Sequence, residues 1–114
     1  MDERVYEEIK KYMFYESGKN WVKVRMDLED IGLVDKENLI VDFGMRSLDF
    51  RAIGYKGKNL RLRVPKTHYA YNPAKSKYLV KENKLIISLF KKKEEDNWFT
   101  LAKQKMIGEG IDDQ

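Results

Sequence analysis

The sequence predicts an all-β protein, a seven-stranded antiparallel β-sandwich, on the strength of three observations. Short stretches alternate apolar and polar residues with a period of two, which is typical of strands that bury one face. Turn-forming residues separate these stretches at short intervals, and no long helical pattern lies between them. With 114 residues the chain has the usual size of one domain. Seven strands within roughly 80 residues favour two packed sheets over a closed barrel.

A short helical pattern opens the chain. Val5, Ile9 and Tyr12 recur at the spacing of one helix face, with Asp2 as a capping residue. A helix of this length is too short to be stable alone, so we expect it to dock on the sheets or to fray. Residues 1–11 are therefore predicted to be an N-terminal extension or linker helix, with strand structure from about Tyr12.

The other strands follow from the same period-two pattern. Pro65 should end one of them, because proline cannot donate a hydrogen bond to a neighbouring strand. Residues 68–75, which include Pro73, form the longest irregular stretch. Strands are predicted at residues 22–28, 39–43, 48–52, 60–64, 77–80 and 84–92.

Residues 12–103 are predicted to form the domain, and residues 104–114 a flexible tail. After the last strand, Trp98, Leu101 and Met106 form a short apolar pattern. The tail combines glycine and aspartate, which favour disorder at a chain end.

The last predicted strand, residues 84–92, is apolar on both faces. One face continues the core pattern, and the opposite face carries Ile86 and Phe90. A strand of this kind is either buried on both sides or exposes apolar surface to a partner. Either the N-terminal helix or the segment around Trp98 covers these two side chains, or a partner protein does.

The composition favours a binding module over an enzyme. The chain has no cysteine, which excludes disulfides, cysteine-based metal sites and thiol nucleophiles. His68 is the single histidine, so a histidine-dependent catalytic site would have one base available. The aspartates lack the loop spacing of a calcium site. No apolar run reaches the roughly 18 residues of a membrane span. We therefore expect no catalytic residues, no metal and no cofactor, and a cytoplasmic or nuclear protein.

Charge is distributed unevenly along the chain. Lysine and arginine total 23 against 19 acidic residues, but residues 51–93 carry 13 basic side chains and a single acid, Glu82. One interpretation is a basic patch that binds a polyanion, a nucleic acid or an acidic protein tail such as that of tubulin. The other is that basic strands pair with acidic neighbours in the fold and neutralise them. The candidate residues of the basic patch are Arg51, Arg61, Arg63 and Lys66.

Several segments in a fixed order resemble one protein family. They are Phe14-Tyr15-Glu16, residues 21–28, residues 36–43, residues 77–80, and residues 84–93 running to Trp98. In this order and spacing they resemble the CS domain, the seven-stranded sandwich of small co-chaperones of the ninety-kilodalton heat-shock chaperone. The lysines at 91–93, and Trp98 followed by Leu101, are most similar to the calcyclin-binding branch of that family, also called Siah-interacting proteins. The resemblance covers about residues 12–103.

This resemblance implies a non-enzymatic protein-interaction module. Its partner would be the ninety-kilodalton heat-shock chaperone or a component of a ubiquitin ligase, bound by one sheet face. The family's aromatic residue before the first turn matches Tyr15, and its basic residue opening the last strand matches Lys84. The pattern's outward aromatic residue falls at Asp27, or at Met26 if the register slips by one, and Ile86 stands where the family has an acid. The predicted binding face consists of Tyr15, Lys23, Arg25, Lys84, Ile86 and Phe90.

Further expectations come from the family's architecture. Relatives of the calcyclin-binding type carry an N-terminal helical dimerisation hairpin and a C-terminal tail that binds calcium sensors. Neither pattern is recognisable in this sequence, so we expect a monomer. The fold also resembles small heat-shock chaperones, which implies weak holdase activity through exposed strand edges. We do not expect a membrane or a nucleic acid to be the main partner.

Overall fold

Eight strands and two short 3-10 helices make up the described part of the chain. They are β1 (Glu7–Glu8), β2 (Met13–Ser17), β3 (Trp21–Asp27), η1 (Ile31–Leu33), η2 (Lys36–Asn38), β4 (Leu39–Gly44), β5 (Ser47–Tyr55), β6 (Lys58–Val64), β7 (Tyr71–Val80) and β8 (Lys84–Lys91). The structure is a computed structural model that describes residues 4–102. No helix among these residues has the length and apolar character needed to cross a membrane.

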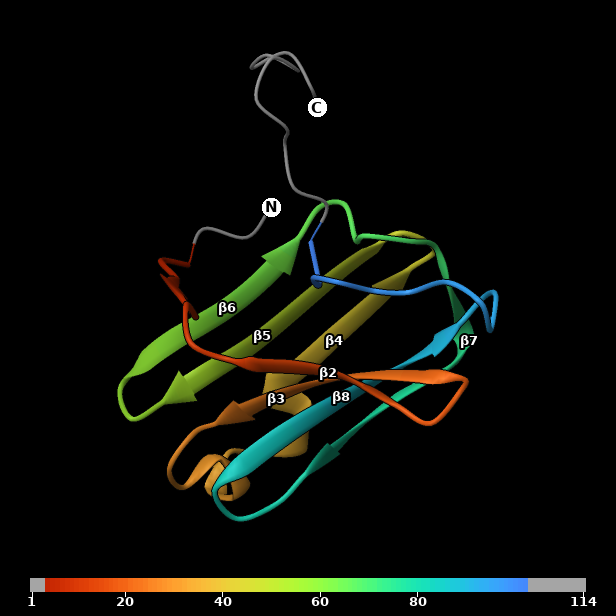
Figure 1. The fold of residues 1–114 in the computed structure, drawn as a ribbon. Helices are drawn as coiled ribbons and strands as arrows, with labels where there is room; N and C mark the ends of the chain where they lie inside the picture. The colour runs from red at the N-terminus through yellow and green to blue at the C-terminus, as the bar shows by residue number, and fades with distance from the viewer. Residues whose placement is uncertain (1–3, 103–114) are drawn as a thin grey trace.

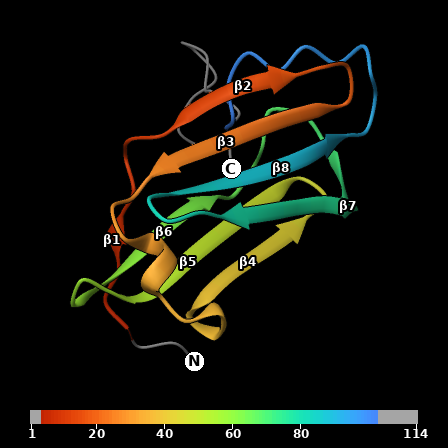
Figure 2. The same ribbon diagram turned by 90° about the horizontal axis from the view of Figure 1, so that it is seen from below.

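The strands form two four-stranded sheets that lie face to face. One sheet has the strand order β1-β6-β5-β4, and the other has the order β2-β3-β8-β7. Figure 1 and Figure 2 show the two sheets as the layers of a sandwich. The predicted all-β sandwich is therefore confirmed.

The core lies between the sheets and consists of alternate residues of the central strands. On β3 and β8, which pair in antiparallel register, every second side chain is fully buried. Burial of such a side chain contributes about 1.5–3 kcal/mol, so these two strands provide a large share of the stability. Their inward residues, each 0% exposed, are Val22, Val24, Met26, Leu85, Ile87 and Leu89. The facing sheet contributes Leu48, Phe50, Ala52, Leu60, Leu62 and Val64.

The N-terminal segment contains a strand and not the predicted helix. Glu7 pairs with Leu60 of β6, and this is the one parallel pairing among the described strands. Ile9 donates its N–H to the carbonyl of Arg61 at 2.8 Å and buries its side chain in the core. Val5, on the predicted helix face, is exposed. The edge of β6 offers hydrogen-bond partners that stabilise an extended segment, whereas a short helix is marginal in water.

β7 begins at Tyr71, inside the 68–75 stretch predicted to be irregular. Tyr71 is buried, and its hydroxyl donates a hydrogen bond to the carbonyl of Ser47. Burial raises the pKa of the Tyr71 phenol above its ordinary value. Pro73 follows within the strand, where proline is tolerated only at an edge or a bulge. β7 satisfies both conditions, because it is the edge of its sheet and its pairing with β8 is irregular.

The irregularity is a bulge of residues 73–76. Asn72 pairs with Phe90, and the regular ladder resumes where Lys77 pairs with Ser88. Within the bulge the hydroxyl of Ser76 accepts the N–H of Phe90 at 3.0 Å and donates to the carbonyl of Asn72 at 2.8 Å. A side chain thus replaces the backbone partner that β8 loses at this point.

The chain after β8 closes one end of the sandwich. Trp98 is 5% exposed, and its ring centroid lies 6.2 Å from that of Phe14 on β2. Leu101 is also buried. Two of the three residues of the predicted apolar pattern therefore join the core, whereas Met106 and the predicted tail at 104–114 lie outside the described residues.

An ion pair between a buried lysine and a partly exposed glutamate fastens this closing segment to the sheet. Lys91 is 4% exposed, and its Nζ lies 3.5 Å from one carboxylate oxygen of Glu16. The same ammonium donates to the carbonyl of Glu94 at 2.9 Å. The other Glu16 oxygen accepts the N–H of Trp98 at 2.7 Å. One carboxylate therefore neutralises a buried charge and anchors the segment that covers the core.

Substitution of Glu16 tests this anchor. Glu16→Ala should lower the free energy of unfolding by about 2 kcal/mol, because Lys91 would stay buried without a counter-charge and Trp98 would lose its acceptor. Urea unfolding followed by tryptophan fluorescence measures the change. The control is Glu7→Ala, which removes an exposed partner of Lys58 and should cost less than about 1 kcal/mol. Equal losses in the two variants would contradict the anchor.

Candidate functional site

All six residues of the predicted binding face lie on the outer side of the β2-β3-β8-β7 sheet, which we call the outward face. Successive side chains of a strand point to opposite sides. On β3 and β8 the inward positions are the fully buried ones, so the positions between them face outward. Strand register makes the following residues direct neighbours: Tyr15 and Lys23, Arg25 and Ile86, Asp27 and Lys84, and Trp21 and Phe90.

Three rows of side chains cross the outward face at right angles to the strands. One row is aromatic, one is rich in lysine and one is mainly apolar. The aromatic row consists of Trp21, Phe90 and Asn72, the lysine row of Tyr15, Lys23, Ser88 and Lys77, and the apolar row of Met13, Arg25, Ile86 and Leu79. Cations and apolar groups from four strands therefore form one surface.

Ile86 and Phe90 are partly exposed on this surface. Neither the N-terminal segment nor the segment around Trp98 covers these two side chains. The N-terminal segment pairs with the other sheet. Trp98 packs against Phe14 and, at a centroid distance of 6.1 Å, against Tyr69. Within residues 4–102, the two-sided apolar character of β8 is therefore an exposed surface and not a second core.

A cluster at one end of the outward face, which we call the Lys–aromatic corner, consists of Trp21, Phe90, Lys75 and Lys77. The two rings pack edge to face, with centroids 5.0 Å apart and an interplanar angle of 86°. Lys75 Nζ lies 4.8 Å from the Phe90 centroid, and Lys77 Nζ lies 5.2 Å from the Trp21 centroid. These distances are typical of cation–π contacts. The sequence pattern does not reveal the corner, because the bulge in β7 decides where its lysines lie.

On the outer side of the β1-β6-β5-β4 sheet, arginines form ion pairs with aspartates of the same sheet. Arg61 donates two hydrogen bonds to Asp49, at 3.0 and 2.8 Å. Arg51 donates to Asp42 at 2.9 Å and lies 3.9 Å from Asp49. Two of the four residues of the predicted basic patch are thus partnered by acids on neighbouring strands, as the second interpretation of the charge pattern expects.

Two lysines at the β5–β6 hairpin are partnered in the same way. Lys56 Nζ lies 2.9 Å from Glu29 Oε1, and Lys58 Nζ lies 2.8 Å from Glu7 Oε1. The hydrogen bond from Lys56, with its charge, lowers the pKa of the Glu29 carboxyl, and the hydrogen bond to Glu29 raises the pKa of Lys56. The other two residues of the basic patch, Arg63 and Lys66, are exposed.

The lysines of the outward face have no such partners. Asp27, at the margin of the face, accepts a hydrogen bond from Arg25 at 2.9 Å. In the part of the chain that the structure describes, no ion pair involves Lys23, Lys75, Lys77 or Lys84. Four lysines that make no ion pair with a described acid therefore share this face.

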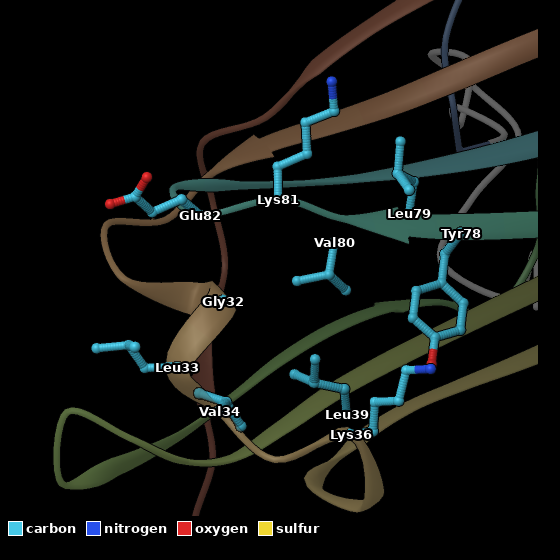
Figure 3. Close-up of a pocket in the computed structure, with 10 residues that line it drawn as sticks. All are labelled: Gly32, Leu33, Val34, Lys36, Leu39, Tyr78, Leu79, Val80, Lys81 and Glu82. Atoms are coloured by element: carbon cyan, nitrogen blue, oxygen red, sulfur yellow. The ribbon is translucent and has the colours of Figure 1, made fainter.

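A groove of about 810 Å³ opens between the sheets beside β7. Figure 3 shows Val34, Leu39 and Val80 around this space, while Lys81 and Glu82 point away from it. The groove has an apolar floor and lies between the η1–η2 segment and the end of an edge strand. The sequence pattern does not reveal this groove, because its walls come from segments far apart in the chain. Its lining residues are Gly32, Leu33, Val34, Lys36, Leu39, Tyr78, Leu79, Val80, Lys81 and Glu82.

His68, the one histidine available as a catalytic base, lies among aromatic side chains. His68 packs edge-on against Tyr69, with centroids 4.6 Å apart, and lies 6.0 Å from Phe99. Tyr71 is buried in the core. Within residues 4–102, no three acidic or histidine side chains come together in a way that could hold a metal ion.

Arginines on one sheet have acidic partners and the lysines of the outward face make no ion pair with a described acid, so removal of a charge should affect stability differently on the two sheets. Asp49→Ala should lower the free energy of unfolding by about 1–2 kcal/mol, because Arg61 loses two charge-assisted hydrogen bonds. Lys77→Ala should change it by less than about 1 kcal/mol, since no acid depends on that lysine and its contact with the Trp21 ring lies at the surface. Urea denaturation of both variants measures the difference. Equal effects would contradict the unequal partnering.

Comparisons with known proteins identify the fold. Neither the protein-family models nor the curated proteins gave a match to the sequence. Among solved structures, the CS domain of the human KIAA1068 protein is similar, with a TM-score of 0.66 over 82% of this chain and 73% of that chain, at 14% identity. Heat shock protein 16.0 from Schizosaccharomyces pombe is similar with a TM-score of 0.58 over 92% of this chain and 88% of that chain, at 17% identity. The chain therefore has the fold that is common to CS domains and small heat shock proteins.

Proposed function

We propose that the chain is a non-enzymatic, chaperone-associated protein-interaction domain that binds its partner through the outward face. The observation that carries this proposal is the exposure of Ile86 and Phe90 among cations on one continuous sheet surface. Apolar anchors surrounded by cations suit a protein surface with apolar and acidic side chains. The fold, shared with a CS domain and a heat shock protein, supports a chaperone-associated role.

We propose the ninety-kilodalton heat-shock chaperone as the binding partner, with a ubiquitin-ligase component as the alternative. Tyr15 and Lys84, which match the family's binding residues, both lie on the outward face. Asp27 stands opposite Lys84 and is held by Arg25, so an acid occupies the place of an aromatic anchor. Aromatic anchors dominate many interfaces. We therefore propose that this chain binds the chaperone more weakly than a CS domain that carries an aromatic residue at the position of Asp27.

Binding of a polyanion by the basic patch is the weaker candidate. Arg51 and Arg61 are bonded to Asp42 and Asp49 at 2.8–3.0 Å. A polyanion would have to displace these acids or lie beside them, and like charges at such short range oppose that approach. The likeness to the calcyclin-binding branch remains part of the proposal, and it rests on the sequence segments alone.

Titration of isotope-labelled protein with the N-terminal domain of the ninety-kilodalton chaperone tests the proposed face by NMR. We expect amide shifts to concentrate at Tyr15, Lys84 and Ile86. The double variant Lys84→Glu with Phe90→Ser should bind about tenfold more weakly or worse, because it inverts a charge and removes an anchor. Each variant must first show the amide spectrum of the folded protein.

The matched control makes the same two changes outside the outward face, as Lys66→Glu with Phe99→Ser. Both control positions are exposed, so the control should bind like the wild type. If Tyr15, Lys84 and Ile86 stay unmoved while other resonances shift, the outward face is not the binding surface. If only the control variant loses its affinity for the chaperone domain, the basic patch and not the outward face is the binding surface.

A further inference from the structure

We infer that the Lys–aromatic corner, together with Lys23, binds an extended acidic peptide segment in which acidic and apolar side chains alternate on one side. This inference rests on the proposed function, because it gives the chemistry of the partner at the same face. Four features of the outward face carry it: the spacing of the lysines, their positioning by aromatic rings, their lack of acidic partners, and the distance to the apolar row.

Lys23 and Lys77 stand on either side of a small residue. In the register both are direct neighbours of Ser88, which is 5% exposed. Neighbouring strands lie about 4.8 Å apart, so the backbones that carry the two lysines are separated by about 10 Å. Ser88 is covered by its neighbours, and Lys77 crosses β8 to lie over the Trp21 ring on β3, the strand that carries Lys23. A carboxylate bound at this point therefore lies within reach of both ammonium groups.

The aromatic rings hold two of the lysines in place before any partner arrives. Lys75 lies over Phe90 and Lys77 over Trp21, at 4.8 and 5.2 Å from the ring centroids. An ammonium group has three N–H donors, and contact with a ring leaves donors free to bond a carboxylate. A side chain that is already positioned loses less entropy on binding than a free one.

Charge complementarity identifies the occupant as acidic. In the basic segment, some cations meet acids of this chain, as Arg61 meets Asp49 and Lys58 meets Glu7. The lysines of the outward face make no ion pair with any described acid. A partner with carboxylates would supply the charges that this surface lacks.

The distance between the lysine row and the apolar row determines how acidic and apolar side chains alternate along the peptide. Ile86 and Leu79 lie two residues along their strands from Ser88 and Lys77 of the lysine row. Two residues of extended chain span about 6.7 Å. A peptide that runs parallel to these strands has the same spacing between side chains on one side. An acidic side chain at the lysine row therefore places the next side chain on that side at the apolar row.

A single-stranded nucleic acid fits this surface poorly, although it is also an anion. Bases bind to proteins largely by stacking on open aromatic faces. Trp21 and Phe90 pack against each other edge to face, and ammonium groups lie over both rings. The corner therefore presents cations to a ligand and not a stacking platform.

A synthetic peptide of repeated Glu-Ser-Leu-Ser units, titrated into isotope-labelled protein, tests the inference by NMR. We expect amide shifts centred on Lys23, Ser88 and Lys77, and an affinity that falls as salt is added. The matching peptide with glutamine in place of glutamate should not bind. The variant Lys23→Gln with Lys77→Gln should bind the acidic peptide about tenfold more weakly. The control Lys56→Gln with Lys58→Gln removes the same charge at partnered lysines and should leave the affinity unchanged.

Three results would overturn the inference: equal binding of the glutamine peptide, equal loss of affinity in the control variant, and tighter binding of oligothymidylate than of the acidic peptide. The inference and the proposed function can also fail separately. If the chaperone domain shifts the amide resonances of the outward face and the acidic peptide does not, only the inference is wrong. If the acidic peptide shifts the lysine row and the chaperone domain shifts nothing, the inference holds and the proposed chaperone is wrong.

Discussion

The in-register pairing of β3 with β8 is the constraint on which the rest of the structure depends. Val24 and Ile87 are opposite each other and fully buried, and the residues on either side of them face outward. A slip of one residue would place the apolar side chains in water and the lysines in the core, which the protein could not tolerate. The core and the outward face are therefore two consequences of one register, and neither can be changed without the other.

Strand pairing also decides which charges remain available to a partner. The basic segment at residues 51–93 enters both sheets, but Arg51 on β5 and Arg61 on β6 meet Asp42 and Asp49 across the strands. On the other sheet the cross-strand neighbours of Lys23 and Lys77 include Ser88, which cannot neutralise them. A net charge summed along the chain hides this difference, because neutralisation depends on the neighbour across the strand.

This dependence on neighbours explains how far the sequence could predict the molecule. The alternation of a half-buried strand is visible in consecutive residues, so the sequence predicted which side of β3 and β8 faces outward. It failed where the deciding contact is long-range. Ile9 joins the core because β6 accepts its segment as a further strand, although its spacing from Val5 and Tyr12 is that of a helix. The groove beside β7 escaped prediction for the same reason, since its walls come from separate parts of the chain.

The bulge in β7 connects the least predictable part of the fold with the candidate site. If the ladder continued unbroken from Lys77 opposite Ser88, Lys75 would stand opposite Phe90 as a direct strand neighbour. Asn72 holds that position instead, and residues 73–76 are displaced from the ladder. Lys75 consequently reaches over the Phe90 ring, 4.8 Å from its centroid. Bulges are known to redirect side chains at functional sites. Here the bulge turns a regular edge strand into one wall of a cationic, aromatic surface.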